Sequence, residues 1–333
     1  MQKQEVTIYD VAREAGVSMA TVSRVVNGNT NVRKETRDKV SAVIERLHYQ
    51  PNAVAQGLAS KKTTTVGLIV PGLTNLHFAE LSKGIDDIAS MYKYNIILSS
   101  VENNLLSEEK VIQGLLNKQV DGVIYMSNSM SNKAREAFAR TNTPVVLAGT
   151  IDESNEFGSV SIDFKTAEND VFNLFYKDGK RKLALAVGDE GAFINKGNRI
   201  VYYKEFLEKN NLGAANVYDH ITSYEDGYEL ADKLLADNVD AIMVTRDLPA
   251  AGLVNALTDK GIKIPEQLEI VSATSTNIAK VVRPHLTTVQ QPLYDIGAVA
   301  MRMLTKLMNK EELDEKHISL GYTLQYGQTT LNK

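Results

Sequence analysis

Residues 7–28, which read TIYDVAREAGVSMATVSRVVNG, constrain the fold more tightly than any other part of the chain. Apolar residues recur at helical spacing over 8–15, Gly16 begins a turn, and Ser18 can cap a second helical run. A third run over 34–47 also carries its apolar residues on one face. Three short helices of this kind can enclose a small core, so we predict an all-α helix-turn-helix domain here.

The second of these helices has the side chains that a DNA-reading helix needs. Met19, Ala20 and Arg24 lie near its start, where a recognition helix offers side chains to base edges. Arg24 is the only long donor there, and Arg to guanine is the commonest specific contact. The other candidate DNA contacts, chiefly polar side chains suited to phosphate oxygens, are Thr7, Tyr9, Ser18, Thr21, Ser23, Asn27 and Tyr49. The alternative is an ordinary helical hairpin whose exposed face is polar.

Charge is divided unevenly along the chain. The net charge is −4, yet residues 1–62 contain ten Lys or Arg against six Asp or Glu and carry +4. The remainder holds 27 basic and 35 acidic residues and carries −8. This asymmetry is expected where only one part faces phosphates, although a charged segment is also typical of any solvated surface.

From residue 65 onward, short apolar runs alternate with amphipathic stretches. The candidate strands are 66–70, 95–99, 122–126, 145–148, 183–187, 241–244 and 269–273. Helical stretches lie between most of them, such as 78–92, 107–117, 166–177 and 248–260. The repetition of strand and helix, with fully apolar strands, predicts α/β architecture with doubly wound parallel sheets covered on both faces.

About nine strands are generous for one sheet, so we expect two lobes, with the chain crossing between them near Ile162 and Gln290. The predicted domains are the headpiece over 1–50, a hinge helix and linker over 51–62, an N-terminal core lobe over 63–162 with 291–322, and a C-terminal core lobe over 163–290. Two such lobes form a cleft, and clefts of this kind bind small molecules at the carboxyl ends of the strands.

Several classes of protein are disfavoured. The chain has no Cys, which excludes disulfides and thiolate metal sites, and no apolar run long enough to cross a membrane. Nucleotide, zinc-protease and hydrolase motifs are missing, so we expect no enzyme, no cofactor and no metal site. A sugar-binding transport protein would explain two lobes, but it requires a secretory signal that we do not find and leaves residues 7–28 unexplained. We therefore expect a cytoplasmic protein.

Residues 7–27 resemble the signature helix-turn-helix of the LacI/GalR repressor family, and YQPNAVAQGLAS, 49–60, resembles the hinge of that family. The resemblance implies a two-lobed, periplasmic-binding-protein-like core and a homodimer that binds double-stranded operator DNA. It also implies that the hinge residues Asn52, Ala55 and Leu58 contact DNA, with Leu58 inserted as a wedge in the minor groove. Pro51 can start such a helix, and Gly57 weakens it, so it forms best on DNA. A plain linker is the alternative.

The segment QPLYDIGAVAMRMLTKLMNKE, 291–311, is similar to the branch of this family that controls carbon catabolite genes. That resemblance implies a protein corepressor, the serine-phosphorylated phosphocarrier protein HPr, bound through Tyr294, Asp295, Met301, Arg302 and Lys306. Arg302 and Lys306 are four residues apart, so on a helix their cations converge and suit an anionic partner. An amphipathic helix with a solvated basic side explains the same spacing.

The predicted cleft departs from the pattern of sugar-responsive relatives. Tyr202 stands where those relatives have Gly after Arg199, and Thr274 replaces a carboxylate, while Arg246-Asp247 keeps the acidic position. Sugar hydroxyls need matched polar partners, so a tight sugar inducer is disfavoured. Arg199, Arg246 and Lys196 instead suit a small phosphorylated metabolite as an auxiliary effector, unless they are ordinary surface charges.

Overall fold

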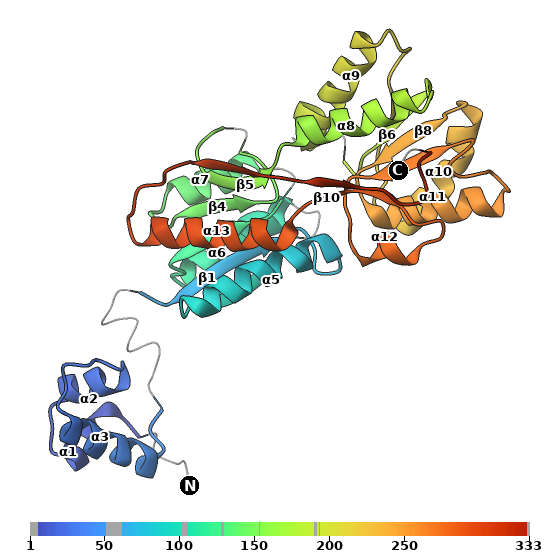
Figure 1. The fold of residues 1–333 in the computed structure, drawn as a ribbon. Helices are drawn as coiled ribbons and strands as arrows, with labels where there is room; N and C mark the ends of the chain where they lie inside the picture. The colour runs from blue at the N-terminus through green and yellow to red at the C-terminus, as the bar shows by residue number, and fades with distance from the viewer. Residues whose placement is uncertain are drawn as a thin grey trace. The chain divides into compact units, whose positions relative to one another are not determined.

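The protein is described here from a computed structural model. It describes residues 6–50, 62–101, 105–127, 130–152, 154–189, 192 and 194–331, with side chains of the helix at 105–117 described from Glu108 onward. The chain divides into two compact units, Met1–Thr63 and Thr64–Lys333 (Figure 1). The predicted fold class, a helical headpiece with two parallel-sheet lobes, is confirmed.

The headpiece consists of α1 (Ile8–Ala15), α2 (Met19–Val26) and α3 (Lys34–Leu47). Helix α1 begins where the Asp10 carboxylate accepts hydrogen bonds from the backbone N–H of Thr7 at 3.0 Å and from its hydroxyl at 2.7 Å. It ends at Gly16, whose φ of 62° lies in the left-handed region that glycine adopts without strain. The three helices enclose a small core of fully buried side chains: Val11, Ala15, Val22 and Val40.

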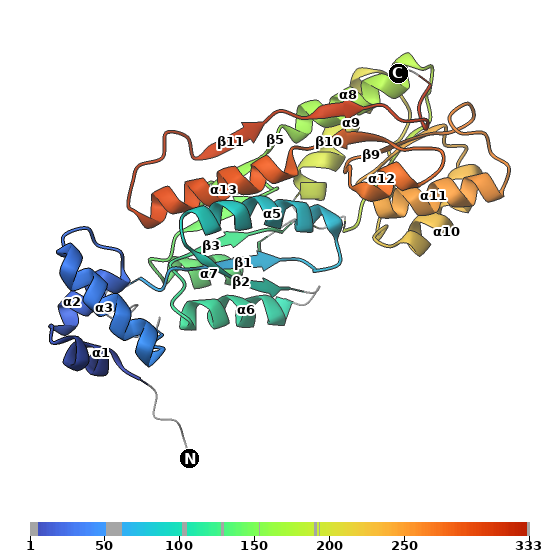
Figure 2. The same ribbon diagram turned by 60° about the horizontal axis from the view of Figure 1, so that its bottom comes forward.

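The first sheet of the core has six parallel strands in the order β11-β5-β4-β3-β1-β2. They are β1 (Thr65–Val70), β2 (Asn95–Ser100), β3 (Gly122–Tyr125), β4 (Val145–Ala148), β5 (Gly158–Ile162) and β11 (His317–Leu320). Helices α5 (Leu76–Met91) and α13 (Leu293–Met308) cover one face. Helices α6 (Leu105–Asn117) and α7 (Asn132–Ala139) cover the other, as Figure 2 shows for α5, α13 and α6.

The second sheet has the order β12-β10-β9-β8-β6-β7, in which β12 is antiparallel to β10. Its strands are β6 (Leu183–Ala186), β7 (Asn216–Tyr218), β8 (Ala241–Val244), β9 (Glu269–Ser272), β10 (Thr287–Gln290) and β12 (Thr323–Gln325). One face packs on α8 (Phe164–Lys177) and α9 (Ile200–Lys209), which follows a π-helical segment, Ile194–Arg199. The other packs on α10 (Tyr224–Ala236), α11 (Asp247–Asp259) and α12 (Asn277–Val281).

The chain passes between the two sheets three times. It leaves the first sheet between β5 and α8, returns between β10 and α13, and leaves again between β11 and β12. Strands β5, β7, β10, β11 and β12 lie outside the candidate strands named from the sequence. Each of these is short, and most contain polar residues where the predicted strands are apolar.

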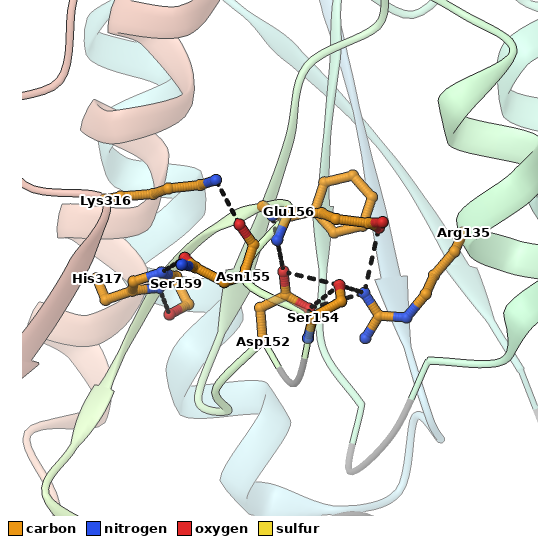
Figure 3. A network of polar contacts seen from close by, with 9 residues as sticks. Arg135, Asp152, Ser154, Asn155, Glu156, Ser159, Lys316 and His317 are labelled. Atoms are coloured by element: carbon orange, nitrogen blue, oxygen red, sulfur yellow. Dashed lines mark hydrogen bonds and ion pairs between the residues drawn. The ribbon is translucent and has the colours of Figure 1, made fainter.

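A polar network fixes the connection between β4 and β5 (Figure 3). The Asp152 carboxylate accepts hydrogen bonds from the backbone N–H groups of Glu156 at 2.5 Å and Phe157 at 2.7 Å, and pairs with Arg135 of α7 at 2.7 Å. On its other side the connection meets β11, where the His317 ring bonds both Asn155 and Ser159. Side chains from three segments thus hold one loop in place.

Candidate nucleic-acid interface and effector sites

Helix α2, the predicted recognition helix, presents the predicted reading residues to solvent. Met19, Ala20 and Arg24 of α2 are exposed, whereas Val22 on the opposite side is fully buried in the headpiece core. The helix begins at Ser18, whose Oγ accepts the N–H of Thr21 at 3.2 Å and lies 3.0 Å from its hydroxyl. The exposed face of α2 therefore has a long cationic donor, Arg24, beside the apolar side chains of Met19 and Ala20, an arrangement suited to contacts with base edges in a major groove.

The flanking candidates are placed differently from one another. Tyr9 is 65% exposed and Thr7 is exposed beside it, so both side chains are accessible to a DNA backbone. Asn27 donates to the Ser23 hydroxyl at 3.4 Å, which keeps these two polar side chains together. Tyr49 is half-buried against the headpiece core and has a packing role as well. The predicted hinge contacts lie outside the described residues: Asn52, Ala55 and Leu58.

One contact that shapes the headpiece beside α2 was not predicted from the sequence. The Arg37 guanidinium of α3 lies against the loop that follows α2, with Nη2 3.3 Å from the carbonyl oxygen of Asn29, 3.4 Å from that of Thr30 and 3.4 Å from that of Val32. A cationic donor shared by these carbonyls fixes the loop beside the recognition helix. No spacing rule predicts this contact, because the loop folds back onto a later helix.

The proposed corepressor residues of α13 divide between surface and core. Tyr294, Asp295 and Arg302 are exposed, and the Tyr294 hydroxyl donates to Asp87 of α5 at 2.9 Å. Lys306 is half-exposed and bonds Asp314 at 2.9 Å. The prediction that Met301 contacts a partner at the surface is wrong, because its side chain is fully buried in the core. The boundary between buried and exposed sides of α13 runs between Met301 and Arg302.

A cavity of about 850 Å³ lies between the two lobes of the core. Its lining includes all four cleft residues predicted from the sequence, Arg199, Arg246, Asp247 and Thr274. It also includes Asn75, His77 and Gln291, which sequence reasoning missed. Lys196 is exposed and is not part of this lining, which favours the alternative that it is an ordinary surface charge.

Arg199 is held by a buried carboxylate. Its Nη1 lies 3.1 Å from Oε1 of Glu168, and its guanidinium lies 5.4 Å from the centre of the Phe164 ring. Burial raises the pKa of Glu168 to about 7, while the positive charge of Arg199 opposes this rise. The charge of Arg199 is thus partly matched from within the protein.

Asp247 and Thr274 are structural neighbours although they are distant in sequence. The backbone N–H of Asp247 donates to Thr274 Oγ1 at 3.0 Å, and the Asp247 carboxylate accepts the N–H of Thr276 at 2.6 Å. Both residues are buried. They fix two loops at the carboxyl ends of β8 and β9, so their polar groups are already used within the protein.

Arg246 and His77 lie close together at one end of the cleft. Among the described residues we find no ion pair to Arg246, whose pKa is lowered by burial, with Asp247 opposing. Burial, reinforced by the nearby charges of Arg246 and Arg199, lowers the pKa of His77 to about 4. His77 is therefore neutral near pH 7 and offers an imidazole beside a guanidinium, a combination that suits an anion.

The described residues contain no group of three or more His, Cys, Asp or Glu side chains arranged to hold a metal ion. Within the same described part, no helix is both long and apolar enough to span a bilayer.

Comparison with known proteins places these sites in context. The profile for bacterial regulatory proteins of the lacI family matches residues 7–52, and that for the periplasmic binding protein-like domain matches residues 172–330. The chain is 64% identical, over all of both sequences, to the HTH-type transcriptional regulator pepR1 of Lactobacillus delbrueckii subsp. lactis. It is 50% identical, over 98% of both sequences, to catabolite control protein A of Streptococcus mutans serotype c.

Solved structures of transcriptional regulators are also similar to this chain. The transcription regulator CcpA of Lactococcus lactis matches with a TM-score of 0.76 and 41% identity, covering 80% of this chain and 98% of that one. The lac repressor dimer bound to operator and the anti-inducer ONPF matches with a TM-score of 0.89 and 26% identity, covering 99% of this chain and 100% of that one.

Proposed function

This chain belongs to the LacI family of DNA-binding transcriptional regulators, and from that premise we propose that it is a dimeric repressor of carbon catabolite genes with serine-phosphorylated HPr as its corepressor. It acts in the cytoplasm on catabolite-responsive operators. The similarity to catabolite control protein A along nearly the whole chain supports the gene class.

Operator reading is assigned to α2. Its exposed face, with Arg24 as the long donor and Met19 and Ala20 beside it, supports a major-groove contact in each half-site. A palindromic operator requires two headpieces, so the active species is a homodimer. Large apolar side chains exposed on the core support association with a second copy: Leu73, Leu76, Leu98 and Val281 are each more than 40% exposed. The hinge residue Leu58 then wedges the central minor groove.

The observation that best supports the corepressor proposal is that two cationic side chains lie close together on one side of α13. Arg302 is exposed and Lys306 is half-exposed one helical turn later. A phosphoserine has nearly two negative charges near neutral pH, so charge-assisted bonds from Arg302, with Lys306 as a point charge, suit it. The corepressor then acts by binding better to the arrangement of lobes that favours operator binding.

The test is operator affinity, measured by fluorescence anisotropy across a titration of HPr in both phosphorylation states. The wild-type chain is expected to bind operator more tightly as phosphorylated HPr is added, and unphosphorylated HPr is expected to do little. Arg302→Ala is expected to keep basal operator affinity and lose the increase. If the variant responds like the wild-type chain, the phosphate is not read on α13.

A second candidate effector is favoured by the cleft. Arg246 and neutral His77 line a cavity large enough for a metabolite, and both suit an anionic group. A small phosphorylated metabolite is therefore proposed as an auxiliary or alternative effector. Thermal unfolding with glucose 6-phosphate against glucose tests this: a shift with the phosphate alone supports it, and equal shifts or none contradict it.

A further inference from the structure

Helices α5 and α13 approach each other through two reciprocal glycines. A Cβ added at Gly84 of α5 would lie far inside contact distance of the Tyr294 carbonyl oxygen and 3.0 Å from the backbone nitrogen of Ala298. A Cβ at Gly297 of α13 would meet the Leu81 carbonyl oxygen in the same way. Each clash is with helix backbone, which cannot rotate away as a side chain can. The two helices therefore touch backbone to backbone.

The second lobe repeats this arrangement between α10 and α11. A Cβ at Gly227 would meet the carbonyl oxygen of Pro249, and one at Gly252 would meet the carbonyl oxygen of Tyr224. Two helix pairs in one chain thus use the same reciprocal contact, but only the pair in the first lobe includes α13. The second pair supplies an internal control for the first.

The close approach of α5 determines where the exposed residues of α13 lie. The backbone that meets Gly84 belongs to Tyr294 itself, whose hydroxyl donates to Asp87, three residues beyond Gly84 on α5. Figure 2 shows the two helices side by side over the sheet. A methyl group at Gly84 or Gly297 must separate the axes, which shifts α13 relative to α5 and strains the Tyr294–Asp87 hydrogen bond.

We propose that Gly84 and Gly297 are positioning residues for corepressor binding: their backbone contact sets the height and register of the α13 face on which the phosphorylated partner docks. This inference rests on the proposed function. The glycines do not contact the partner. They act through Tyr294, because its backbone lies against Gly84 and its ring is tied to Asp87. A partner that spans Tyr294 and Arg302 needs both at fixed positions, and small displacements weaken charge-assisted contacts.

The experiment compares Gly84→Ala and Gly297→Ala with Gly252→Ala, which adds a methyl group against a carbonyl oxygen in the second lobe. Melting temperature, basal operator affinity and the concentration of phosphorylated HPr that half-saturates the operator response are measured for full-length dimers. We expect all three variants to melt earlier than wild type. We expect Gly84→Ala and Gly297→Ala to need at least about tenfold more HPr, while Gly252→Ala stays within twofold.

A second pair of variants avoids added bulk. Asp87→Ala removes the acceptor for the Tyr294 hydroxyl and is expected to raise the half-saturating HPr concentration several-fold. Asp87→Asn keeps an acceptor and is expected to restore the response, which would not happen if the Asp87 charge contacted the partner. These variants decide the proposal should the glycine variants fail to fold.

The outcomes separate this inference from the proposed function. If the wild-type chain responds to phosphorylated HPr and Gly84→Ala responds equally, or if Gly252→Ala loses the response as severely, the positioning role is overturned and the corepressor assignment stands. If the wild-type chain does not respond at all, the proposed function fails and this inference with it.

Discussion

Asp314, in the connection between α13 and β11, pairs with Lys306 of α13, with Oδ2 2.9 Å from Nζ. The hydrogen bond and the opposite charges raise the pKa of Lys306 and lower that of Asp314. A carboxylate of the same chain is thus already paired with Lys306, one of the two cations proposed to bind the phosphoserine. A phosphate must displace Asp314 before Lys306 can contribute fully.

We expect Asp314→Asn to strengthen the response to phosphorylated HPr by about two- to threefold, because an exposed pair contributes little and its loss frees one cation. Basal operator affinity is expected to stay the same. Glu312→Gln removes the same charge from the same acidic connection, and no contact between Glu312 and Lys306 is found among the described residues, so it serves as the control. Equal gains in both variants would indicate a general charge effect instead.

Arg24→Ala is expected to weaken operator binding by roughly 1–3 kcal/mol per half-site, because Arg24 is the long donor on the reading face of α2. Binding to random DNA is expected to change far less. The measurement is anisotropy with operator and scrambled duplexes at one salt concentration, since affinity depends steeply on salt. Arg13→Ala, an equal loss of charge on α1, is the control. Parallel losses on both duplexes would place Arg24 on phosphate rather than on bases.

Asp152→Ala is expected to lower the free energy of unfolding by roughly 2–4 kcal/mol, because it removes the buried carboxylate partner of Arg135 and the acceptor for three loop N–H groups. Although burial opposes ionisation, the hydrogen bonds from Phe157 and Arg135 hold the pKa of Asp152 below its usual value. Its contribution is therefore present above about pH 4 and is lost as the pH falls through the folded-state pKa. Urea denaturation at pH 7 and pH 3 checks both statements. Asp152→Asn, which keeps one acceptor, should lose less, and an unchanged midpoint for Asp152→Ala at pH 7 would contradict the assignment.

The sequence predicted those strands whose residues are apolar on both faces, since such runs are typical of buried parallel sheets. It missed β5 and β10 because they bury hydroxyls. Ser159 of β5 is satisfied by His317, and Thr287 of β10 lies 2.8 Å from the hydroxyl of Thr330. These partners are more than forty residues away, so local pattern does not distinguish such a strand from a polar loop.

The sites show a similar division. The exposed face of α2 follows from helical periodicity, because Val22 marks the buried side. Spacing on α13 places Met301 and Arg302 on neighbouring rows but does not tell which row faces the sheet, and Met301 was misassigned for that reason. His77 of the cleft was also missed, since nothing near it in the sequence indicates that it lines the same cavity as Arg246, close enough to be influenced by its charge.

Glu269, at the start of β9, is a fully buried carboxyl group next to the C-terminal segment of the described chain. Its Oε1 accepts the N–H of Leu331 at 2.7 Å. Burial raises the pKa of Glu269 to about 8; the hydrogen bond with Asp178 and the charge of that carboxylate reinforce the rise, whereas the Leu331 N–H and Lys180 oppose it. Two carboxyl groups in contact share a proton more readily than they both ionise.

The free energy of unfolding is therefore expected to fall as the pH rises. The folded chain keeps the Glu269 proton up to about pH 8, whereas the unfolded chain releases it near 4.5, so between these values the native state binds more protons. One such proton gives a slope approaching about 1.4 kcal/mol per pH unit.

Glu269→Gln keeps an acceptor for Leu331 and has no proton to lose, so its stability should match wild type near pH 5 and exceed it at pH 9. Urea denaturation from pH 5 to 9 checks this, with Glu266→Gln, the same change at an exposed position, as the control. Parallel stability curves for wild type and Glu269→Gln would show that Glu269 is already ionised in the folded protein.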